Sequence, residues 1–330
     1  MRSIYTAIAF GVAFLVVSFG SNAATAPWQP TRPVAFIIGA APGGSIDLSA
    51  RMIQQLWDQN RITSTPTIII NKPGAAHGLA WSYLNDRGAD GHSISIGTTN
   101  LVTNEIIGSH KLGYRDVTPL AVLFDDYIAL AVRADSPLKN WKDVAERLRR
   151  DAGALTIAFG PSLGAGPHTA AAVAIKAAGV NAAGARFVVY KSAGEALVAL
   201  LGGQIDIVAG SLPNMPAYMQ SGRIRVLGIT APRRVEGAFA QVPTLKEQGF
   251  DAVFTNWRSV IGPKDMRPEH IAYWERALAQ VSQTADWKRD LERNYWTSNF
   301  LTGADAFRFI DNSSKQFRAL WAEIGTRAGQ

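Results

Sequence analysis

Apolar runs, glycine-rich loops and helical patterns alternate in the first third of the chain. Apolar residues at Ile46, Ile53 and Trp57 fall on one face of a helix that follows a glycine-rich loop at residues 39–44. β-rich runs precede and follow this helix. The strands that they predict are Val34–Ile38, Thr67–Asn71 and Ser93–Gly97. The order strand, helix, strand, helix, strand predicts a parallel sheet with helices on both faces.

The same order of elements returns in the middle of the chain. A loop rich in glycine and proline at 160–167 again separates a strand from an alanine-rich helix, and Gly164 takes the place that Gly43 has in the first unit. The strands of this second unit are Leu155–Phe159, Arg186–Tyr190 and Ile205–Ala209. Two matched units predict two α/β lobes, each with a mainly parallel sheet flanked by helices.

The loops that follow parallel strands are where such sheets bind ligands. Helix N-termini there present unpaired N–H groups, which favour an anion, and glycine lets the backbone come close to it. In the first loop, Gly43, Gly44 and Ser45 would present amides to a carboxylate. Asp47, in the first helical turn, either stabilises the helix start or shapes the pocket. Two lobes with facing loops predict a clamp for a small anion.

The N-terminus has the three parts of a secretory signal peptide. Arg2 is followed by an apolar stretch from residue 7 to residue 19 and by small residues up to Ala23. This stretch is shorter than the roughly 20 residues of a membrane-spanning helix, although an uncleaved anchor is the alternative. We expect residues 1–23 to be removed near Ala23 and the mature protein to be exported.

Composition supports a folded protein and narrows its chemistry. With 47% hydrophobic and 18% charged residues, the chain has ample material for a core. It has no cysteine, which excludes disulfides and thiolate catalysis. The net charge is +7, but the basic residues sit among acids or at turns, so no nucleic-acid partner is expected. The histidines lack metal-binding spacing, and neither a metal nor another cofactor is expected.

A serine hydrolase is the alternative function, because Gly160-Pro-Ser-Leu-Gly164 matches the G-x-S-x-G elbow of α/β-hydrolases. Either Asp251 or Asp265, followed by His270, would complete a triad with Ser162 in the order Ser, Asp, His. An elbow needs its helix to begin almost at the serine, however, whereas good helix formers start here only after Pro167. The spacing therefore favours a binding protein that is not an enzyme.

Three other side chains have two interpretations each. His168, at a helix start, hydrogen-bonds either a ligand or a neighbouring backbone group. Trp257 follows a β-like run and belongs either to the core, which we favour, or to a pocket wall. Arg258 is either exposed or in contact with the ligand. Its planar guanidinium suits a carboxylate, so we favour the ligand.

An ordered set of short motifs resembles one known family. The motifs are Pro42-Gly-Gly-Ser-Ile-Asp47, Asn71-Lys-Pro-Gly-Ala75, the run 200–206 with Ser211-Leu-Pro213, the run 222–230, and Val242-Pro-Thr244. Each motif is weak alone, but the ordered set is similar to the tripartite tricarboxylate transporter receptors, also called Bug-type solute-binding proteins. The resemblance covers nearly the whole mature chain.

This resemblance implies a periplasmic receptor of the type II Venus flytrap fold, with two lobes joined by two crossing strands. It implies a small carboxylate ligand held by loops of both lobes, and as partners a membrane permease or a sensor protein. With the residues that follow the third strand of each unit, the predicted site is Gly43, Gly44, Ser45, Asp47, Thr99, Asn100, Gly164, Gly166, His168, Thr169, Ser211 and Arg258.

Departures from the family pattern narrow the expected ligand. Gly210 stands where the family often has an aspartate that would suit an ammonium group, and Arg258 adds a cation. His77 replaces a glycine or asparagine. We therefore expect a di- or tricarboxylate or another organic acid without an amino group. With crossings near Tyr127–Val132 and Phe250–Asn256, the lobes would comprise residues 24–128 plus 252–330 and residues 129–251 of a monomer.

Overall fold

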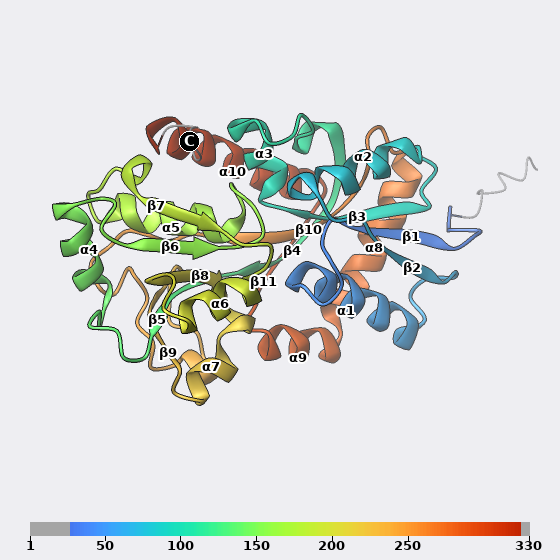
Figure 1. The fold of residues 1–330 in the computed structure, drawn as a ribbon. Helices are drawn as coiled ribbons and strands as arrows, with labels where there is room; N and C mark the ends of the chain where they lie inside the picture. The colour runs from blue at the N-terminus through green and yellow to red at the C-terminus, as the bar shows by residue number, and fades with distance from the viewer. Residues whose placement is uncertain (1–26, 325–330) are drawn as a thin grey trace, which may run out of the picture.

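Residues 27–324 form two β-sheets, each covered by helices on both faces, in the computed structural model that describes this part of the chain (Figure 1). The predicted signal peptide, residues 1–23, lies outside the described residues. No helix within residues 27–324 has the length and apolar character needed to cross a membrane. Each sheet with its helices is called a lobe below.

The first lobe is built on six strands in the order β11-β4-β10-β3-β1-β2. The strands are β1 (Val34–Ile38), β2 (Thr67–Asn71), β3 (Ser93–Thr98), β4 (Val117–Asp126), β10 (Asn256–Pro263) and β11 (Thr297–Thr302). β1 pairs in parallel with both β2 and β3, so the first predicted βαβαβ unit is confirmed. All five residues of β1 are buried, as expected of a central parallel strand.

The second lobe is built on five strands in the order β7-β6-β8-β5-β9. The strands are β5 (Ile128–Arg133), β6 (Thr156–Phe159), β7 (Arg186–Val189), β8 (Ile207–Ser211) and β9 (Ile224–Ile229). β6 pairs in parallel with β7 and β8, which confirms the second βαβαβ unit.

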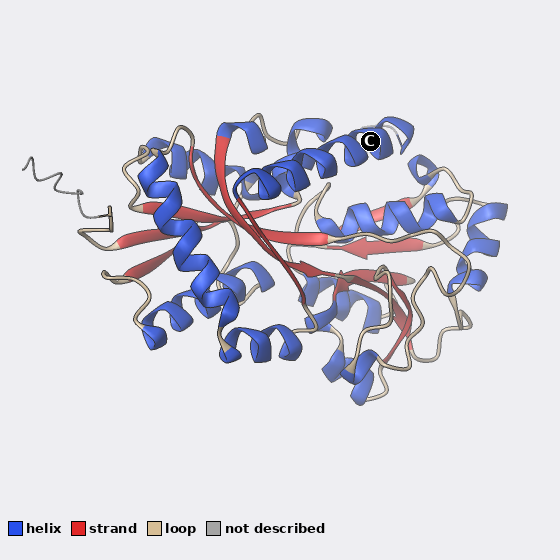
Figure 2. Cartoon of the chain, turned by 180° about the vertical axis from the view of Figure 1, so that it is seen from behind, coloured by secondary structure: helices blue, strands red, loops and turns tan. Residues whose placement is uncertain are grey.

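The two sheets are mixed rather than mainly parallel, because each accepts a strand from the other lobe. Through Tyr127 the chain passes directly from β4 into β5, which inserts antiparallel between β8 and β9. The chain later returns to insert β10 antiparallel between β3 and β4. A strand that arrives from the opposite lobe enters at the edge where the parallel strands end, so it must run against them. Figure 2 shows these long strands passing between the lobes.

Helices cover both faces of each sheet (Figure 1). The α-helices are α1 (Ser45–Asn60), α2 (Gly78–Asp86), α3 (Asn100–Ile107), α4 (Trp141–Arg150), α5 (Gly166–Ala177), α6 (Ala193–Leu201), α7 (Pro216–Gln220), α8 (Pro268–Gln283), α9 (Ala285–Arg293) and α10 (Gly303–Ile324). In the first lobe, α1 and α8 share one face, where the rings of Trp57 and Trp274 lie 5.4 Å apart. α2, α3 and α10 share the other face.

The C-terminal helix α10 starts in the first lobe and ends on the second. It packs against α3 and β4, and farther along, Trp321 lies 5.0 Å from the ring of His168 on α5. Lys176 of α5 and Glu323 of α10 form an ion pair of 2.6 Å. Apolar residues of both lobes therefore belong to one continuous core cluster, which couples the position of one lobe to that of the other.

Candidate functional site

A cavity of about 900 Å³ lies between the two lobes and is lined by loops from both. The first lobe contributes residues 39–46, 73–77, Thr98, Asn100, Asn256 and Arg258. The second lobe contributes residues 160–162, 165–167, 191–194, Ser211 and Asn214. These are the loops after the strands of the two βαβαβ units together with the crossing strand β10, so the structure brings the two predicted loops together.

Charged side chains at this cavity are basic. Lys191 and Arg258 line it, and no aspartate or glutamate among residues 27–324 does. Arg258 is 3% exposed and pairs with the buried Asp126 at 3.2 Å, so most of its charge is compensated within the protein. Lys191 is exposed and forms no ion pair with any side chain of the described chain. The residual positive charge therefore favours an anion at the mouth of the cavity.

Four helices begin at the cavity wall, which supplies a second source of positive potential. They are α1, α3, α5 and α6. No side chain caps the first residues of α1 or α5. The first amides of α1, from Ser45 onward, therefore have no acceptor within the helix, and the same holds for Gly166 of α5. Free amides at the positive ends of two helices from opposite lobes suit a carboxylate.

The two glycine loops have the same internal bond. Gly43 has φ of 81°, and its N–H donates to the carboxylate of Asp47 at 2.9 Å. Gly164 has φ of 71°, and its N–H donates to Nδ1 of His168, also at 2.9 Å. In each loop, then, a glycine in the left-handed region is held by the side chain four residues later. These bonds set the path of the backbone that lines the cavity.

The surroundings of these two side chains differ. Asp47 accepts further bonds from Arg51 at 2.7 Å and from Asn71 at 2.8 Å. Burial raises the pKa of Asp47, but these donors outweigh it and hold the pKa below its usual value. His168 stacks on Phe159 with ring centroids 4.4 Å apart, and burial lowers its pKa to about 3. The imidazole is therefore neutral at physiological pH.

A polar network below the cavity joins the lobes at the crossing strands. Asp126, at the end of β4, accepts hydrogen bonds from Ser211 of β8 at 2.6 Å and from Asn256 at 3.1 Å. Desolvation raises the pKa of Asp126, while Arg258 and these two donors oppose the rise. Sequence reasoning missed Asp126 and Asn256. Their signal was their position at the two predicted crossings, because Asp126 directly precedes the first and Asn256 is the last residue of the second.

Seven of the twelve predicted residues line the cavity. They are Gly43, Gly44, Ser45, Asn100, Gly166, Ser211 and Arg258. The other five, namely Asp47, Thr99, Gly164, His168 and Thr169, are not among the lining residues. The ligand contact expected of them stays a prediction, but the structure gives them supporting bonds. Thr99 donates to Asn256 at 3.4 Å, and Thr169 donates to the Gly164 carbonyl at 3.3 Å.

A direct contact between the lobes crosses the cavity edge at Gly164. Thr103 of α3 donates to the Gly164 carbonyl at 2.8 Å. A Cβ on Gly166 would come within 2.2 Å of the Asn256 side chain. A Cβ on Gly164 would also come within 2.5 Å of Ile107, so the second-lobe loop packs tightly on the first lobe and both positions require glycine.

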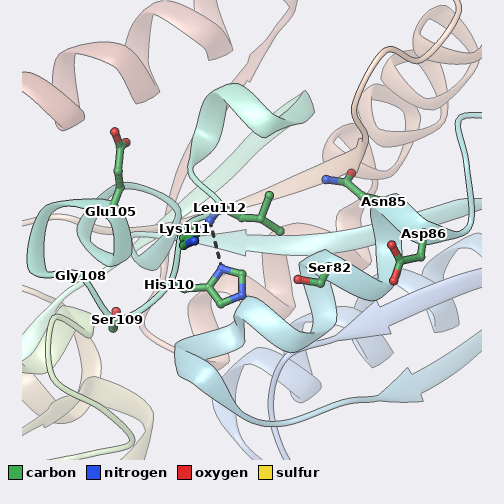
Figure 3. A pocket seen from close by; sticks show the side chains of 9 residues that line it. All are labelled: Ser82, Asn85, Asp86, Glu105, Gly108, Ser109, His110, Lys111 and Leu112. Atoms are coloured by element: carbon green, nitrogen blue, oxygen red, sulfur yellow. Dashed lines mark hydrogen bonds between the residues drawn. The ribbon is translucent and has the colours of Figure 1, made fainter.

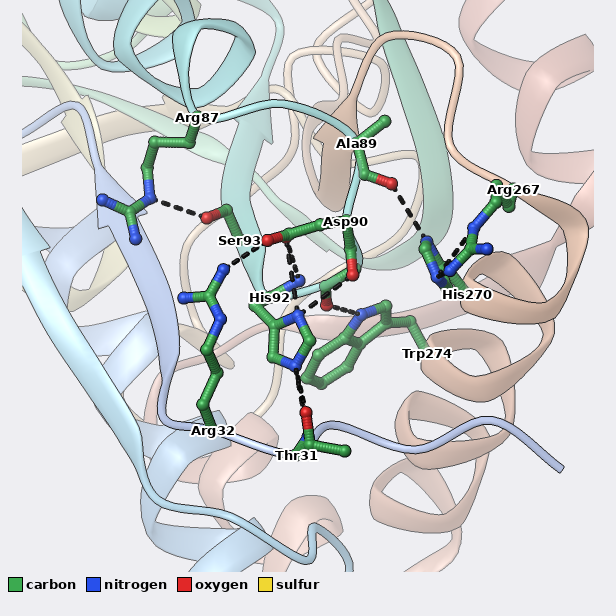
Figure 4. Close-up of polar contacts among 11 residues, drawn as sticks. Thr31, Arg32, Arg87, Ala89, Asp90, His92, Ser93, Arg267, His270 and Trp274 are labelled. Atoms are coloured by element: carbon green, nitrogen blue, oxygen red, sulfur yellow. Dashed lines mark hydrogen bonds and ion pairs between the residues drawn. The ribbon is translucent and has the colours of Figure 1, made fainter. Parts of the chain in front are cut away.

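Ser162 lines the cavity but is not set up as a nucleophile. Its hydroxyl is buried and has no hydrogen-bond partner within residues 27–324. His270, the candidate base, belongs to α8, where its Nδ1 contacts the Ala89 carbonyl at 3.0 Å and its Nε2 contacts Arg267 (Figure 4). α5 begins at Gly166, earlier than expected because proline is tolerated in a first helical turn, but it still begins after Ser162.

A shallower hollow lies elsewhere on the first lobe, between the end of α2 and the loop after α3 (Figure 3). Its charged side chains are of both signs, Asp86, Glu105 and Lys111. His110 there accepts a hydrogen bond from the Leu112 N–H at 3.1 Å. Residues of the second lobe do not contribute, so it lacks the two-sided enclosure of the inter-lobe cavity.

Comparison with known proteins decides the family. The model of the tripartite tricarboxylate transporter family receptor matches residues 50–326. This chain belongs to that family. A Cupriavidus necator relative, "UPF0065 protein in gbd 5'region", is 25% identical over 329 residues, or 97% of each chain. BugT of Bordetella pertussis is 26% identical over 268 residues, or 79% of each chain. The receptor family predicted from the ordered motifs is confirmed.

Solved structures of related proteins confirm the fold. The periplasmic binding protein BugD has a TM-score of 0.77 at 21% identity, covering 90% of this chain and 99% of BugD. MatC from Rhodopseudomonas palustris, solved with bound malate, has a TM-score of 0.73 at 22% identity, covering 88% and 99%. An adipate-bound R. palustris protein has a TM-score of 0.79 at 22% identity, covering 90% and 98%. This receptor therefore has the two-lobed periplasmic-binding-protein fold, in a family of solute-binding receptors.

Proposed function

We propose that this receptor binds a small carboxylate without an amino group in the inter-lobe cavity, in the periplasm, for uptake or sensing. The observation that carries the proposal is the convergence of uncapped helix N-termini from opposite lobes on one cavity whose charged lining residues are basic. Backbone amides and helix dipoles favour a carboxylate without a matching side chain. Malate-bound and adipate-bound proteins of the same fold support the same ligand class.

We expect the ligand to lack an amino group because the carboxylate nearest the cavity already has its hydrogen-bond partners. Asp126 is the acid of the polar network below the cavity, and its Oδ2 already accepts bonds from Ser211, Asn256 and Arg258. Within the described chain, no other carboxylate is supplied to the cavity. An ammonium group would therefore lose its hydration near Arg258 without gaining an ionic partner.

Closure of the lobes on the ligand is the proposed mechanism. A carboxylate that contacts the amides of α1 and of α5 makes both contacts only when the lobes are together, so it favours that state. The crossings at Tyr127 and before Asn256 are the natural hinges. A closed receptor would present a changed surface to a membrane permease or a sensor protein. We propose residues 1–23 as the export signal and a monomer as the working unit.

A thermal-shift screen tests this function. Purified protein is heated with succinate, glutarate, adipate and citrate, and with glutamate and glucose as controls. At about a hundred times the dissociation constant, a bound acid adds about 2.7 kcal/mol to the free energy of unfolding, which raises the melting temperature. We expect a rise with one or more of the acids and none with glutamate or glucose.

Matched variants locate the site within the same experiment. Lys191→Gln removes the exposed cation at the cavity and should weaken binding of the active acid about two- to fivefold, the range for an exposed charge pair. Lys288→Gln removes an exposed lysine on α9, which does not line the cavity, and should leave the affinity unchanged. A shift with sugars alone, or equal weakening in both variants, would contradict the proposed site.

A further inference from the structure

The segment after β2 enters the cavity through three consecutive residues in the left-handed region. Ala75, Ala76 and His77 have φ of 46°, 48° and 73°. None is glycine, and holding such residues in this region costs on the order of 1–3 kcal/mol each. The Asn104 side chain donates to the Ala76 carbonyl at 2.9 Å and helps to hold the segment. The surrounding structure therefore maintains a strained backbone whose last residue is His77.

The imidazole of His77 has a fixed orientation. Its Nδ1 lies 2.6 Å from the Gly39 carbonyl, in the loop after β1. A carbonyl only accepts, so Nδ1 carries the proton. A Cβ on Gly39 would come within 2.6 Å of the His77 Cβ, and so glycine at position 39 is what lets the ring reach this carbonyl. Trp81, with its ring centroid 5.8 Å away, packs near the ring.

His77 is neutral in this position. The residue is 4% exposed, and burial together with the charge of Arg258 outweighs the bond to Gly39 and lowers its pKa to about 4. A neutral imidazole with its proton on Nδ1 has a lone pair on Nε2. His77 lines the cavity, and Nε2 has no hydrogen-bond partner among residues 27–324. This nitrogen is therefore a hydrogen-bond acceptor available to a bound molecule.

The other ionisable groups at the cavity have the opposite polarity. Lys191 and Arg258 only donate, as do the backbone amides at the starts of α1 and α5. A simple carboxylate satisfies donors but presents only lone pairs to Nε2. A molecule that satisfies both sides carries a carboxylate and a neutral donor, and a hydroxyl group is the smallest such donor that an organic acid carries.

We propose that His77 is a specificity-determining residue that selects hydroxylated carboxylates, its Nε2 accepting a hydrogen bond from the hydroxyl group of the ligand. This inference rests on the proposed function of the cavity. It distinguishes a hydroxy acid from the unsubstituted acid, which leaves Nε2 unpaired, and from the oxo acid, whose carbonyl oxygen presents a lone pair to a lone pair. A neutral hydroxyl also avoids the repulsion that Arg258 would exert on an ammonium group.

Calorimetric titration with matched acids tests this selection. The probes are succinate and malate at four carbons, and glutarate, 2-hydroxyglutarate and 2-oxoglutarate at five. At the chain length that binds more tightly, we expect the hydroxy acid to bind about three- to tenfold more tightly than the unsubstituted acid, the range for one net hydrogen bond. At five carbons, the oxo acid should bind more weakly than 2-hydroxyglutarate by at least the same factor.

Two variants at position 77 test the residue itself. His77→Gly removes the acceptor and the ring that packs near Trp81, and the relief of left-handed strain offsets part of the cost of the cavity left behind. This variant should reduce the hydroxyl preference, taken as the ratio of the dissociation constants of the two acids for the same variant, to less than twofold. His77→Asn, which tolerates a positive φ and retains an acceptor oxygen, should keep part of the preference. The control His110→Asn changes a histidine of the other hollow and should leave the preference intact.

The outcomes separate this inference from the function on which it rests. If wild-type protein binds the unsubstituted acids as tightly as their hydroxy counterparts, or if His77→Gly keeps the full preference, the role of His77 is refuted and the carboxylate site stands. If none of the acids binds, both proposals fall.

Discussion

The two glycine loops of the cavity use one backbone arrangement and two different chemistries. In the first lobe a carboxylate, Asp47, accepts the Gly43 N–H, and Arg51 and Asn71 also bind this acid. In the second lobe a neutral imidazole, His168, accepts the Gly164 N–H inside a cluster of aromatic rings. The geometry is shared because both loops must turn sharply before a helix whose first amides are left free.

The difference follows from what lies behind each loop. The Asp47 side chain is buried, but its partner Arg51 is 49% exposed, so a hydrated cation stabilises the acid there. Behind the second loop α10 covers His168, which is fully buried near Trp321. A charged group there would lose its hydration without an ionic partner. The same loop geometry therefore needs an ion near solvent and a neutral acceptor in the core.

Of the changes proposed for the two loops, removing the His168 ring should reduce the free energy of unfolding most. His168→Ala deletes a buried ring that contacts Phe159 and Trp321 and leaves the Gly164 N–H without an acceptor. We expect a loss of about 3–5 kcal/mol in the free energy of unfolding, measured by urea denaturation at pH 7. His168→Phe keeps the ring and should lose only about 1–3 kcal/mol. Equal losses in the two variants would show that the packing of the ring contributes nothing.

Adding one methyl group to each loop should affect the stability of the two loops differently. Gly166→Ala places a Cβ 2.2 Å from Asn256, a short side chain that is bonded to Asp126. We expect a loss of about 1–3 kcal/mol from overpacking and weaker binding of the acid found in the thermal screen.

The matched control is Gly44→Ala in the first loop. Its φ is −73°, and the nearest atom to the new Cβ is 3.5 Å away, so its stability should stay near that of the wild type. A destabilised Gly44→Ala together with an unaffected Gly166→Ala would overturn the view that the second loop is the one pressed against the opposite lobe.

The pH dependence of stability should distinguish the neutral acceptor His168 from the charged acceptor Asp47. His168 has a folded pKa of about 3 against 6.5 for the free group. Between these values the unfolded chain binds one more proton than the folded chain. The free energy of unfolding therefore decreases as the pH is lowered, by about 2 kcal/mol from pH 7 to pH 5. His168→Phe lacks this contribution, and its deficit relative to the wild type should narrow by that amount between pH 7 and pH 5.

Asp47 should not make the free energy of unfolding depend on pH between pH 5 and pH 7. Its pKa is held below 3.8, so its stabilising contribution is present above that value and is lost only as pH falls further. His77 is present in both proteins and cancels in the difference. Urea denaturation at several pH values measures the difference in free energy of unfolding between the wild type and His168→Phe. A difference that stays constant from pH 7 to pH 5 would contradict a neutral, buried His168.

Local pattern was sufficient for the repeated units and for part of the site. The glycines at positions 43 and 164 were matched from their place between a strand and a helix, and the structure brings both loops to one cavity. Asp126 and Asn256 could not be found in this way, because they meet only where strands of different lobes cross. For His168 the sequence left two interpretations open, and only the position of α10 shows which surroundings the ring has.

The sequence by itself determined the two βαβαβ units, the glycine loops that end their first strands, and the receptor family. Hydrophobic periodicity and turn residues act over a few positions, so they can be read along the chain. The tertiary structure alone decided that β5 and β10 insert into the opposite sheets, that α10 ends on the second lobe, and that the loop residues divide into those that line the cavity and those behind it. These features depend on contacts between residues far apart in the chain, whose free energy is not encoded in any local pattern.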